Sequence, residues 1–242
     1  MLTPTNILGR ESTTMSPNNE PALRYPKLAD SHHFALCGQT DKKRCELERY
    51  VAQHYLASHQ ARVESFLPHL LSMSRQNTVQ AVAGLKPASS GALFLEQYLD
   101  QTIDQTIAGA TNRPIDRSSI IEIGNLVSTR AGGSQLLFII LAFAIEQAGF
   151  RWLAFTATPQ VKKLLERLSA KPLFLANADA VRLGKTAEAW GAYYQKNPHV
   201  MAIDLNEALH NVAENEAING ISHRYKNAIR DIAAQLKKHA IQ

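Results

Sequence analysis

The alternation of apolar and polar positions predicts a hairpin in the first third of the chain. Residues 41–59 place apolar side chains on one side of a helix. Two β-rich runs follow at 63–73 and 78–85, separated by a polar turn. We expect these runs to pair, with Pro68 at an edge or a bulge, because proline has no backbone N–H to donate. Residues 94–107 fit either a helix or a mixed segment.

The middle of the chain alternates strands with helices. We predict a strand at 119–127, a turn at 128–134 and a helix at 135–149. A second strand follows at 151–158, then a helix at 159–168 and a third strand at 171–176. A helix that crosses from one strand to the next implies that the two strands are parallel. This order predicts an α/β fold, and we expect its sheet to splay between the strands at 119–127 and 151–158.

The last part of the chain is predicted to be mainly helical. Its elements are a short aromatic helix at 187–194, a strand at 200–205 and an amphipathic helix at 222–239. Residues 1–30 are polar and rich in Pro, Asn and Ser, so we expect them to form a flexible leader. We therefore divide the chain into this leader, a core domain over 31–207 and a C-terminal helical extension over 208–242.

Composition narrows the classes of protein that remain. The chain has 242 residues, of which 45% are hydrophobic and 19% charged, which excludes a fibrous protein and wholesale disorder. A net charge of +5 permits an anionic ligand, but no dense Lys/Arg block suggests nucleic acid as a partner. The unbroken apolar run at 136–145 is shorter than the ~20 residues of a membrane span. Since residues 1–30 contain no apolar run of signal-peptide length, we expect a cytoplasmic protein.

Two cysteines, Cys37 and Cys45, are too few for a disulfide scaffold and are not spaced as a zinc-ligand pair. We therefore predict that both are reduced, structural thiols and that the chain has no metal site.

The glycine-rich turn before the apolar helix is the first candidate for ligand binding. It comprises Thr129, Arg130, Gly132, Gly133 and Ser134. A turn between a strand and a helix can direct backbone N–H groups at a phosphate, and the helix N-terminus adds about half a positive charge. The turn matches neither a P-loop nor the dinucleotide-binding fingerprint. The alternative is an ordinary connection in which Ser134 caps the helix.

Polar residues within apolar strands form the second group of candidates. Glu122 lies between two isoleucines, so its carboxylate must be paired, be solvated by a cleft or have a raised pKa. A pKa near neutrality suits a general base, while an ion pair is the structural alternative. Asn125 is a candidate donor to a carbonyl group, or else makes a strand-end hydrogen bond. Thr156 and Thr158 end a strand, where their hydroxyls can meet an amide of a ligand. The alternative is that they serve the strand itself and, for Thr158, the N-cap of the following helix, which is the favoured interpretation for Thr158.

Several sequence blocks carry a resemblance to a known family. They are F-L-P-H-L-L at 66–71, E-I-G-N-L-V-S-T at 122–129, F-T-A-T at 155–158, A-D-A-V-R-L at 178–183, A-W-G-A-Y-Y at 189–194 and P-H-V-M-A-I-D-L at 198–205. In this order, the blocks resemble the bacterial thermostable hemolysin family, from about Arg62 to Leu205. The order of elements is also similar to that of N-acetyltransferases and acyl-homoserine-lactone synthases.

This resemblance implies a mixed central sheet of GNAT-like acyltransferase type with flanking helices. By the same resemblance, Glu122 would be the base, and Arg130 to Ser134 would hold the pyrophosphate of the donor, although Gln135 replaces the last small residue of that motif. The donor would be acyl-CoA or the acyl-phosphopantetheine of an acyl carrier protein, with no permanently bound cofactor. The acceptor would be a small amine or hydroxyl compound.

Two other functions remain open from the sequence. The family name suggests a membrane-active haemolytic protein, whose basic helix at 222–239 would contact a membrane surface. The chain could also be a non-catalytic module that binds an acyl ligand.

Overall fold

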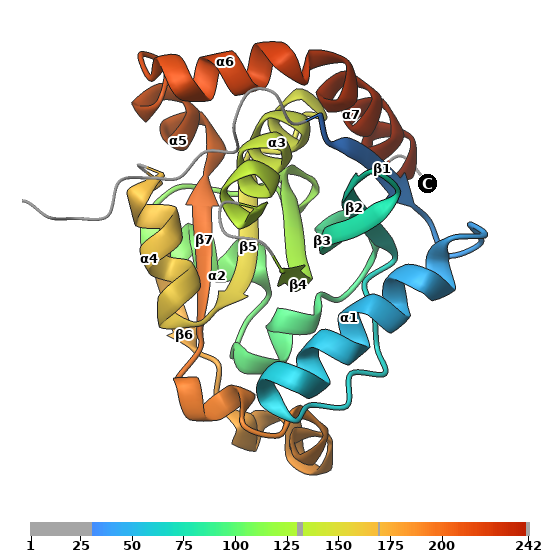
Figure 1. Cartoon of the computed structure of the whole chain (residues 1–242). Coiled ribbons are helices and arrows are strands. Elements are labelled where there is room, and N and C mark those ends of the chain that lie inside the picture. Colours follow the sequence, from blue (N-terminus) through green and yellow to red (C-terminus); the bar gives the residue numbers. More distant parts are fainter. Residues whose placement is uncertain (1–30, 130–132, 169, 241–242) are drawn as a thin grey trace, which may run out of the picture.

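The computed structural model describes residues 31–129, 133–168 and 170–240 (Figure 1). Its strands are β1 (His33–Cys37), β2 (His69–Arg75), β3 (Thr78–Pro87), β4 (Ile120–Ser128), β5 (Trp152–Ala157), β6 (Leu173–Asn177) and β7 (His199–Asp204). Its α-helices are α1 (Arg44–His59), α2 (Ile103–Thr111), α3 (Gly133–Gln147), α4 (Pro159–Arg167), α5 (Leu205–Asn211), α6 (Glu216–Arg224) and α7 (Lys226–Ala240). Short 3₁₀ segments are η1 (Ala88–Ser90), η2 (Phe94–Tyr98), η3 (Arg117–Ser119), η4 (Ala180–Trp190) and η5 (Tyr193–Lys196).

The strands of the described residues form one mixed sheet in the order β1-β2-β3-β4-β5-β7-β6. The predicted hairpin is confirmed as β2 and β3, and the predicted crossover through α3 makes β4 and β5 parallel. The expectation that the strand at 171–176 continues this parallel arrangement is wrong, because β6 pairs antiparallel with β7. β7 is almost fully buried and lies between β5 and β6, while β6 is only partly buried and lies at the edge.

The sheet splays where β4 and β5 separate, as the order of elements predicted. The two strands pair only from Ile120 to Ile123 on β4, although β4 continues to Ser128. Beyond this point β4 also shifts its register against β3, and Asn125 adopts a left-handed conformation with φ of 46°. An extra residue in one strand of a pair bends that strand and turns it away from its neighbours. The bulge therefore accompanies the opening of the sheet.

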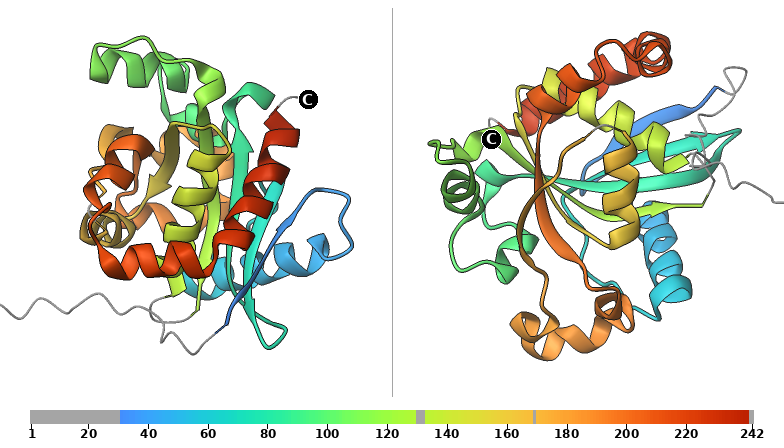
Figure 2. Two further views of the ribbon diagram at one scale, coloured as in Figure 1. Left: turned by 90° about the horizontal axis from the view of Figure 1, so that it is seen from above. Right: turned by 90° about the vertical axis from the view of Figure 1, so that its left-hand side faces the viewer.

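Helices cover both faces of the sheet (Figures 1 and 2). α3 lies on one face, and the apolar sides of α5, α6 and α7 pack around it in the same apolar core. α1 covers the β1–β3 half of the other face, while α2 and the 3₁₀ segments cover the half formed by β4, β5 and β7. Within the part of the chain that the structure describes, no helix has both the length and the hydropathy that a membrane span requires.

Several predicted boundaries are wrong for local reasons. The strand expected from Val63 begins only at His69, directly after Pro68. The aromatic helix expected at 187–194 is two 3₁₀ segments, because Gly191 interrupts it with a φ of 51°. The amphipathic helix expected at 222–239 corresponds to α7, which follows a break at Tyr225.

The proposed division of the chain into parts stays a prediction. The leader at 1–30 lies outside the described residues. The boundary set at residue 207 falls within α5, whose buried Leu205 belongs to the same apolar core as α3.

Candidate active site

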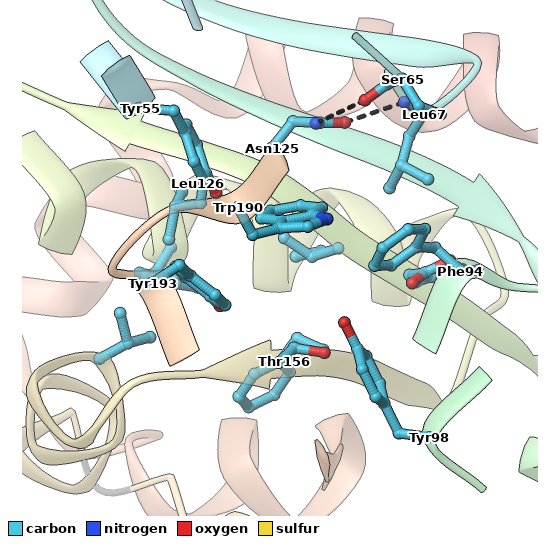
Figure 3. Close-up of a pocket in the computed structure, with 16 residues that line it drawn as sticks. Tyr55, Ser65, Leu67, Phe94, Tyr98, Asn125, Leu126, Thr156, Trp190 and Tyr193 are labelled. Carbon is cyan, nitrogen blue, oxygen red and sulfur yellow. Dashed lines mark hydrogen bonds between the residues drawn. The ribbon is translucent and has the colours of Figure 1, made fainter. Parts of the chain in front are cut away.

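A cavity of about 90 Å³ lies where β4 and β5 separate (Figure 3). It is smaller than the ~300–1,000 Å³ of pockets that hold drug-sized molecules, so only a small reacting group fits it in this conformation. Its walls come from α1, the segment before β2, η2, β4, α3, β5, α4 and the 3₁₀ segments η4 and η5. The lining residues are Tyr55, Ser65, Leu67, Phe94, Tyr98, Glu122, Ile123, Gly124, Asn125, Leu126, Phe138, Phe155, Thr156, Val161, Trp190 and Tyr193.

Glu122 is the charged residue of this lining, and it is almost fully buried, with 3% of its surface exposed. Its two carboxylate oxygens accept hydrogen bonds from the backbone N–H groups of Phe94 and Leu95, both at 2.9 Å. These contacts hold the first turn of η2 against β4. Among the described residues, Glu122 forms no ion pair. Its carboxylate is held in the strand by these two backbone donors instead.

The pKa of Glu122 is raised from 4.5 to about 7. Burial is the largest cause, because it removes water from the charged form. The two backbone donors and the charge of Lys86 lower the pKa, and the charge of Glu96 raises it slightly. A carboxylate with this pKa can both accept and release a proton near neutral pH.

Asn125 lines the cavity, but both polar groups of its side chain bind the protein itself. Its Oδ1 accepts from the N–H of Leu67 at 2.8 Å, and its Nδ2 donates to the carbonyl oxygen of Ser65 at 3.3 Å. These two bonds attach the segment before β2 to the bulge in β4, as Figure 3 shows. These bonds are of the kind expected for the structural alternative, and the role of Asn125 as a donor to a carbonyl group stays a prediction.

The residues of the predicted phosphate-binding turn are only partly described. Arg130 and Gly132 lie outside the described residues. Thr129 does not line the cavity: its N–H and hydroxyl donate to Gln80 of β3, and its hydroxyl also contacts Tyr50. Gly133 is buried at the start of α3, and Ser134 is the second residue of that helix rather than its cap.

The two threonines at the end of β5 differ in position. Thr156 lines the cavity, as predicted for a ligand-binding hydroxyl. Thr158 occupies the N-cap position of α4, followed by Pro159, but its side chain makes no capping hydrogen bond.

The aromatic side chains that line the cavity were not identified from the sequence. Five rings line it, from Tyr55, Phe94, Tyr98, Trp190 and Tyr193. The block at 189–194 signalled an aromatic segment, but nothing along the chain indicated that it would meet α1 and η2. In Figure 3 the indole of Trp190 lies between Tyr55 and Tyr193 on one side and Phe94 on the other.

The structure also decides the state of the cysteines. Both are free thiols; Cys37 is buried, as expected of a structural cysteine, whereas Cys45 is exposed, so the prediction of a structural thiol is wrong for Cys45. Among the described residues, no cluster of three or more His, Cys, Asp or Glu side chains is arranged to hold a metal ion.

Comparisons with known proteins place the chain in a family. The model of the thermostable hemolysin family matches residues 37–209, so the chain belongs to that family. No curated protein matches it at a significant level.

Solved structures share its fold. The AHL synthase LasI superposes with a TM-score of 0.53 at 13% identity, over 76% of this chain and 96% of LasI. TofI in an apo form gives 0.53 at 12% identity, over 78% and 99%. FeeM, an N-acyl amino acid synthase from uncultured soil microbes, gives 0.52 at 8% identity, also over 78% and 99%. The chain therefore has the mixed sheet and flanking helices of the GNAT-like acyltransferase fold, with helices added at its C-terminus.

Proposed function

We propose that this chain is an acyltransferase that moves an acyl group from a thioester to a small amine or hydroxyl acceptor in the cavity between β4 and β5. The observation that carries this proposal is Glu122, a buried carboxylate with a pKa of about 7 that lines a cavity at the splay of the sheet. The fold shared with an AHL synthase and an N-acyl amino acid synthase supports the same class of reaction.

The reaction would proceed by direct attack on the thioester. The acceptor nitrogen or oxygen forms a bond to the acyl carbon while its proton passes to the Glu122 carboxylate. The C–S bond then breaks, and the thiolate that leaves takes the proton back from Glu122. Holding the two reactants side by side accounts for a large part of the rate, because it replaces a bimolecular encounter.

The unpaired edge of β4 suits the developing oxyanion. Beyond Ile123 this strand no longer pairs with β5, so its backbone groups on that side have no strand partner there, although the N–H of Leu126 already donates to the Tyr55 hydroxyl. Fixed N–H donors in a cavity stabilise a negative charge on oxygen without reorganising. Thr156, on the opposite edge, would contact the amide-bearing arm of the donor.

The donor would be acyl-CoA or an acyl carrier protein, and no permanently bound cofactor is needed. The N-terminus of α3, at Gly133 and Ser134, follows β4 and would face the phosphates of either donor, together with Thr129, Arg130 and Gly132. Since both donors belong to the cytoplasm, we place the reaction there.

The test is thiol release from a panel of acyl-CoAs and acyl carrier proteins, measured with and without amine and hydroxyl acceptors. For the wild-type chain we expect turnover that increases with pH through about 7, as Glu122 becomes ionised. In Glu122→Gln, turnover should be lost while calorimetry still detects donor binding. Donor binding with no turnover in the wild-type chain would instead favour a non-catalytic acyl-binding module.

A further inference from the structure

The acceptor side of the cavity is built from aromatic rings that contact one another. The ring centroids of Phe94 and Trp190 are 5.5 Å apart, and those of Trp190 and Tyr193 are 5.4 Å apart. Tyr55 follows at 6.3 Å from Tyr193, and Tyr98 at 6.1 Å from Phe94. We call these five side chains the aromatic wall. Together with Glu122 they line one cavity, to which they present π-faces and ring edges.

The electrostatic character of this cavity is negative once Glu122 is ionised. Glu122 is a carboxylate, whereas Ser65, Asn125 and Thr156 are neutral. Among the described residues that line the cavity, none is Lys, Arg or His. Burial raises the pKa of the wall tyrosines, to about 12 for Tyr55, so their hydroxyls stay protonated at neutral pH. The faces of aromatic rings attract cations, and a carboxylate beside them adds to that attraction.

The wall is also held in place before any ligand arrives. The segment with Trp190 and Tyr193 is tied to the end of α1 by two short backbone bonds, from the N–H of Arg62 to Ala189 at 2.6 Å and from the N–H of Ala192 to His59 at 2.7 Å. The hydroxyl of Tyr98 is hydrogen-bonded to that of Tyr194. A site that is already ordered loses little entropy when it binds a small molecule.

We infer that the aromatic wall and Glu122 select an organic ammonium without a carboxylate, so that the acceptor is a simple amine rather than an alcohol or an amino acid. This inference rests on the proposed function, because the bound ammonium is an acceptor only if the chain is an acyltransferase. An amino acid would bring its own carboxylate close to Glu122 and would find no cation among the described lining residues to pair with it. On this point the chain should differ from FeeM, which is an N-acyl amino acid synthase.

The protons of the ammonium balance in the reaction. The bound ammonium first gives one proton to Glu122, which passes it to water and leaves a neutral amine. That amine forms the C–N bond, the C–S bond breaks, and the second proton moves from nitrogen through Glu122 to the thiolate. The products are an amide and a free thiol.

Calorimetry on the full chain, with no donor present, tests the selectivity with three probes of matched shape. These are ethylamine, ethanol and L-alanine, which are small enough for a cavity of about 90 Å³. We expect the amine to bind about 10-fold more tightly than the alcohol, which is the scale of a desolvated cation–π contact, and more tightly than the amino acid. Glu122→Gln should remove most of the preference for the amine over the alcohol.

Two variants of the wall separate the contribution of its π-faces from that of its bulk. Trp190→Leu should weaken binding of the amine more than binding of the alcohol, whereas Trp190→Phe should retain most of the preference. Chemical unfolding of each variant checks that it is folded. Equal binding of amine and alcohol, tighter binding of L-alanine, or no saturable binding of the amine at millimolar concentration would each overturn the inference.

The failure of this inference and the failure of the proposed function give different results. Selective amine binding with no thiol release from any donor would contradict the acyltransferase and leave the ammonium site standing. Thiol release that depends on L-alanine or on the alcohol, but not on the amine, would overturn the ammonium site and support the acyltransferase.

Discussion

The ionisation of Glu122 should make the folded chain less stable as the pH rises. Its pKa is raised from 4.5 to about 7 in the folded state. Between these two values the folded chain holds a proton that the unfolded chain has released. Linkage then requires the free energy of unfolding to fall with pH. The contribution of Glu122 is therefore complete below pH 4.5 and lost as the pH rises through about 7.

The size of this effect follows from the change in pKa. One pKa unit corresponds to about 1.4 kcal/mol, so a rise from 4.5 to about 7 corresponds to about 3 kcal/mol. Only 3% of the residue is exposed, so solvent screens little of this effect. The loss is a large fraction of the ~5–15 kcal/mol by which domains are usually stable.

Comparison with Glu122→Gln isolates the effect. Glutamine has no charge to lose, and the other charged residues around the site, Glu96 and Arg117 among them, are the same in both proteins. The glutamine amide can accept at only one atom, so the variant loses a hydrogen bond and about 1–3 kcal/mol at every pH. Urea unfolding at a series of pH values from 4.5 to above 7 should show the free energy of unfolding of the wild-type chain falling by about 3 kcal/mol relative to that of Glu122→Gln, so that the wild-type advantage disappears or reverses at high pH. A difference that stays constant over this range would refute a Glu122 pKa near 7.

Three further outcomes are expected. Gly191→Ala should destabilise the chain by about 1–3 kcal/mol in chemical unfolding, because φ is 51° there and an added Cβ would overlap the backbone at the end of α1. The control is Gly220→Ala in α6, where a Cβ meets nothing within 4 Å; this variant should be neutral or stabilising. Asn125→Ala should lower the free energy of unfolding by about 1–3 kcal/mol, since it leaves the N–H of Leu67 in the segment before β2 unpaired. Asn125→Asp keeps the acceptor and should lower it less. Equal losses in the two variants would contradict this role of Asn125. The purified chain should release little dye from anionic liposomes, because the apolar side of α7 is buried against α3; rapid release at nanomolar protein would favour the lytic alternative.

The order of the main elements could be predicted because their hydrophobic patterns are long and regular. The unit from β4 to α4 carries an apolar strand, an almost wholly apolar helix and a strongly amphipathic helix in succession. β1 was missed because its five residues stand outside any regular alternation of strands and helices, whereas β6, equally short, follows α4 in such a series. The insertion of β7 between β5 and β6 was also missed, because no local pattern records which strand pairs with which.

The polar half of the site was easier to find than the aromatic half. Glu122 is conspicuous in the sequence, since a carboxylate between two isoleucines must have a special environment. Tyr55, Phe94 and Trp190 lie on three elements far apart in the chain, and each is an ordinary residue for an apolar core. A cavity wall and a packed core have the same composition, and only the tertiary fold distinguishes them.

The bulge in β4 links the opening of the sheet to the walls of the cavity. At Asn125 the chain takes a left-handed conformation, and the side chain then reaches the segment at 65–67 that closes one side of the cavity. Gly84 on β3 is required beside it, because a Cβ there would lie 2.8 Å from Asn125 Oδ1. A regular, fully paired sheet would bury these backbone groups in hydrogen bonds and leave no room beside Glu122. The irregular backbone that costs stability at this point is thus the same feature that makes space for a reaction.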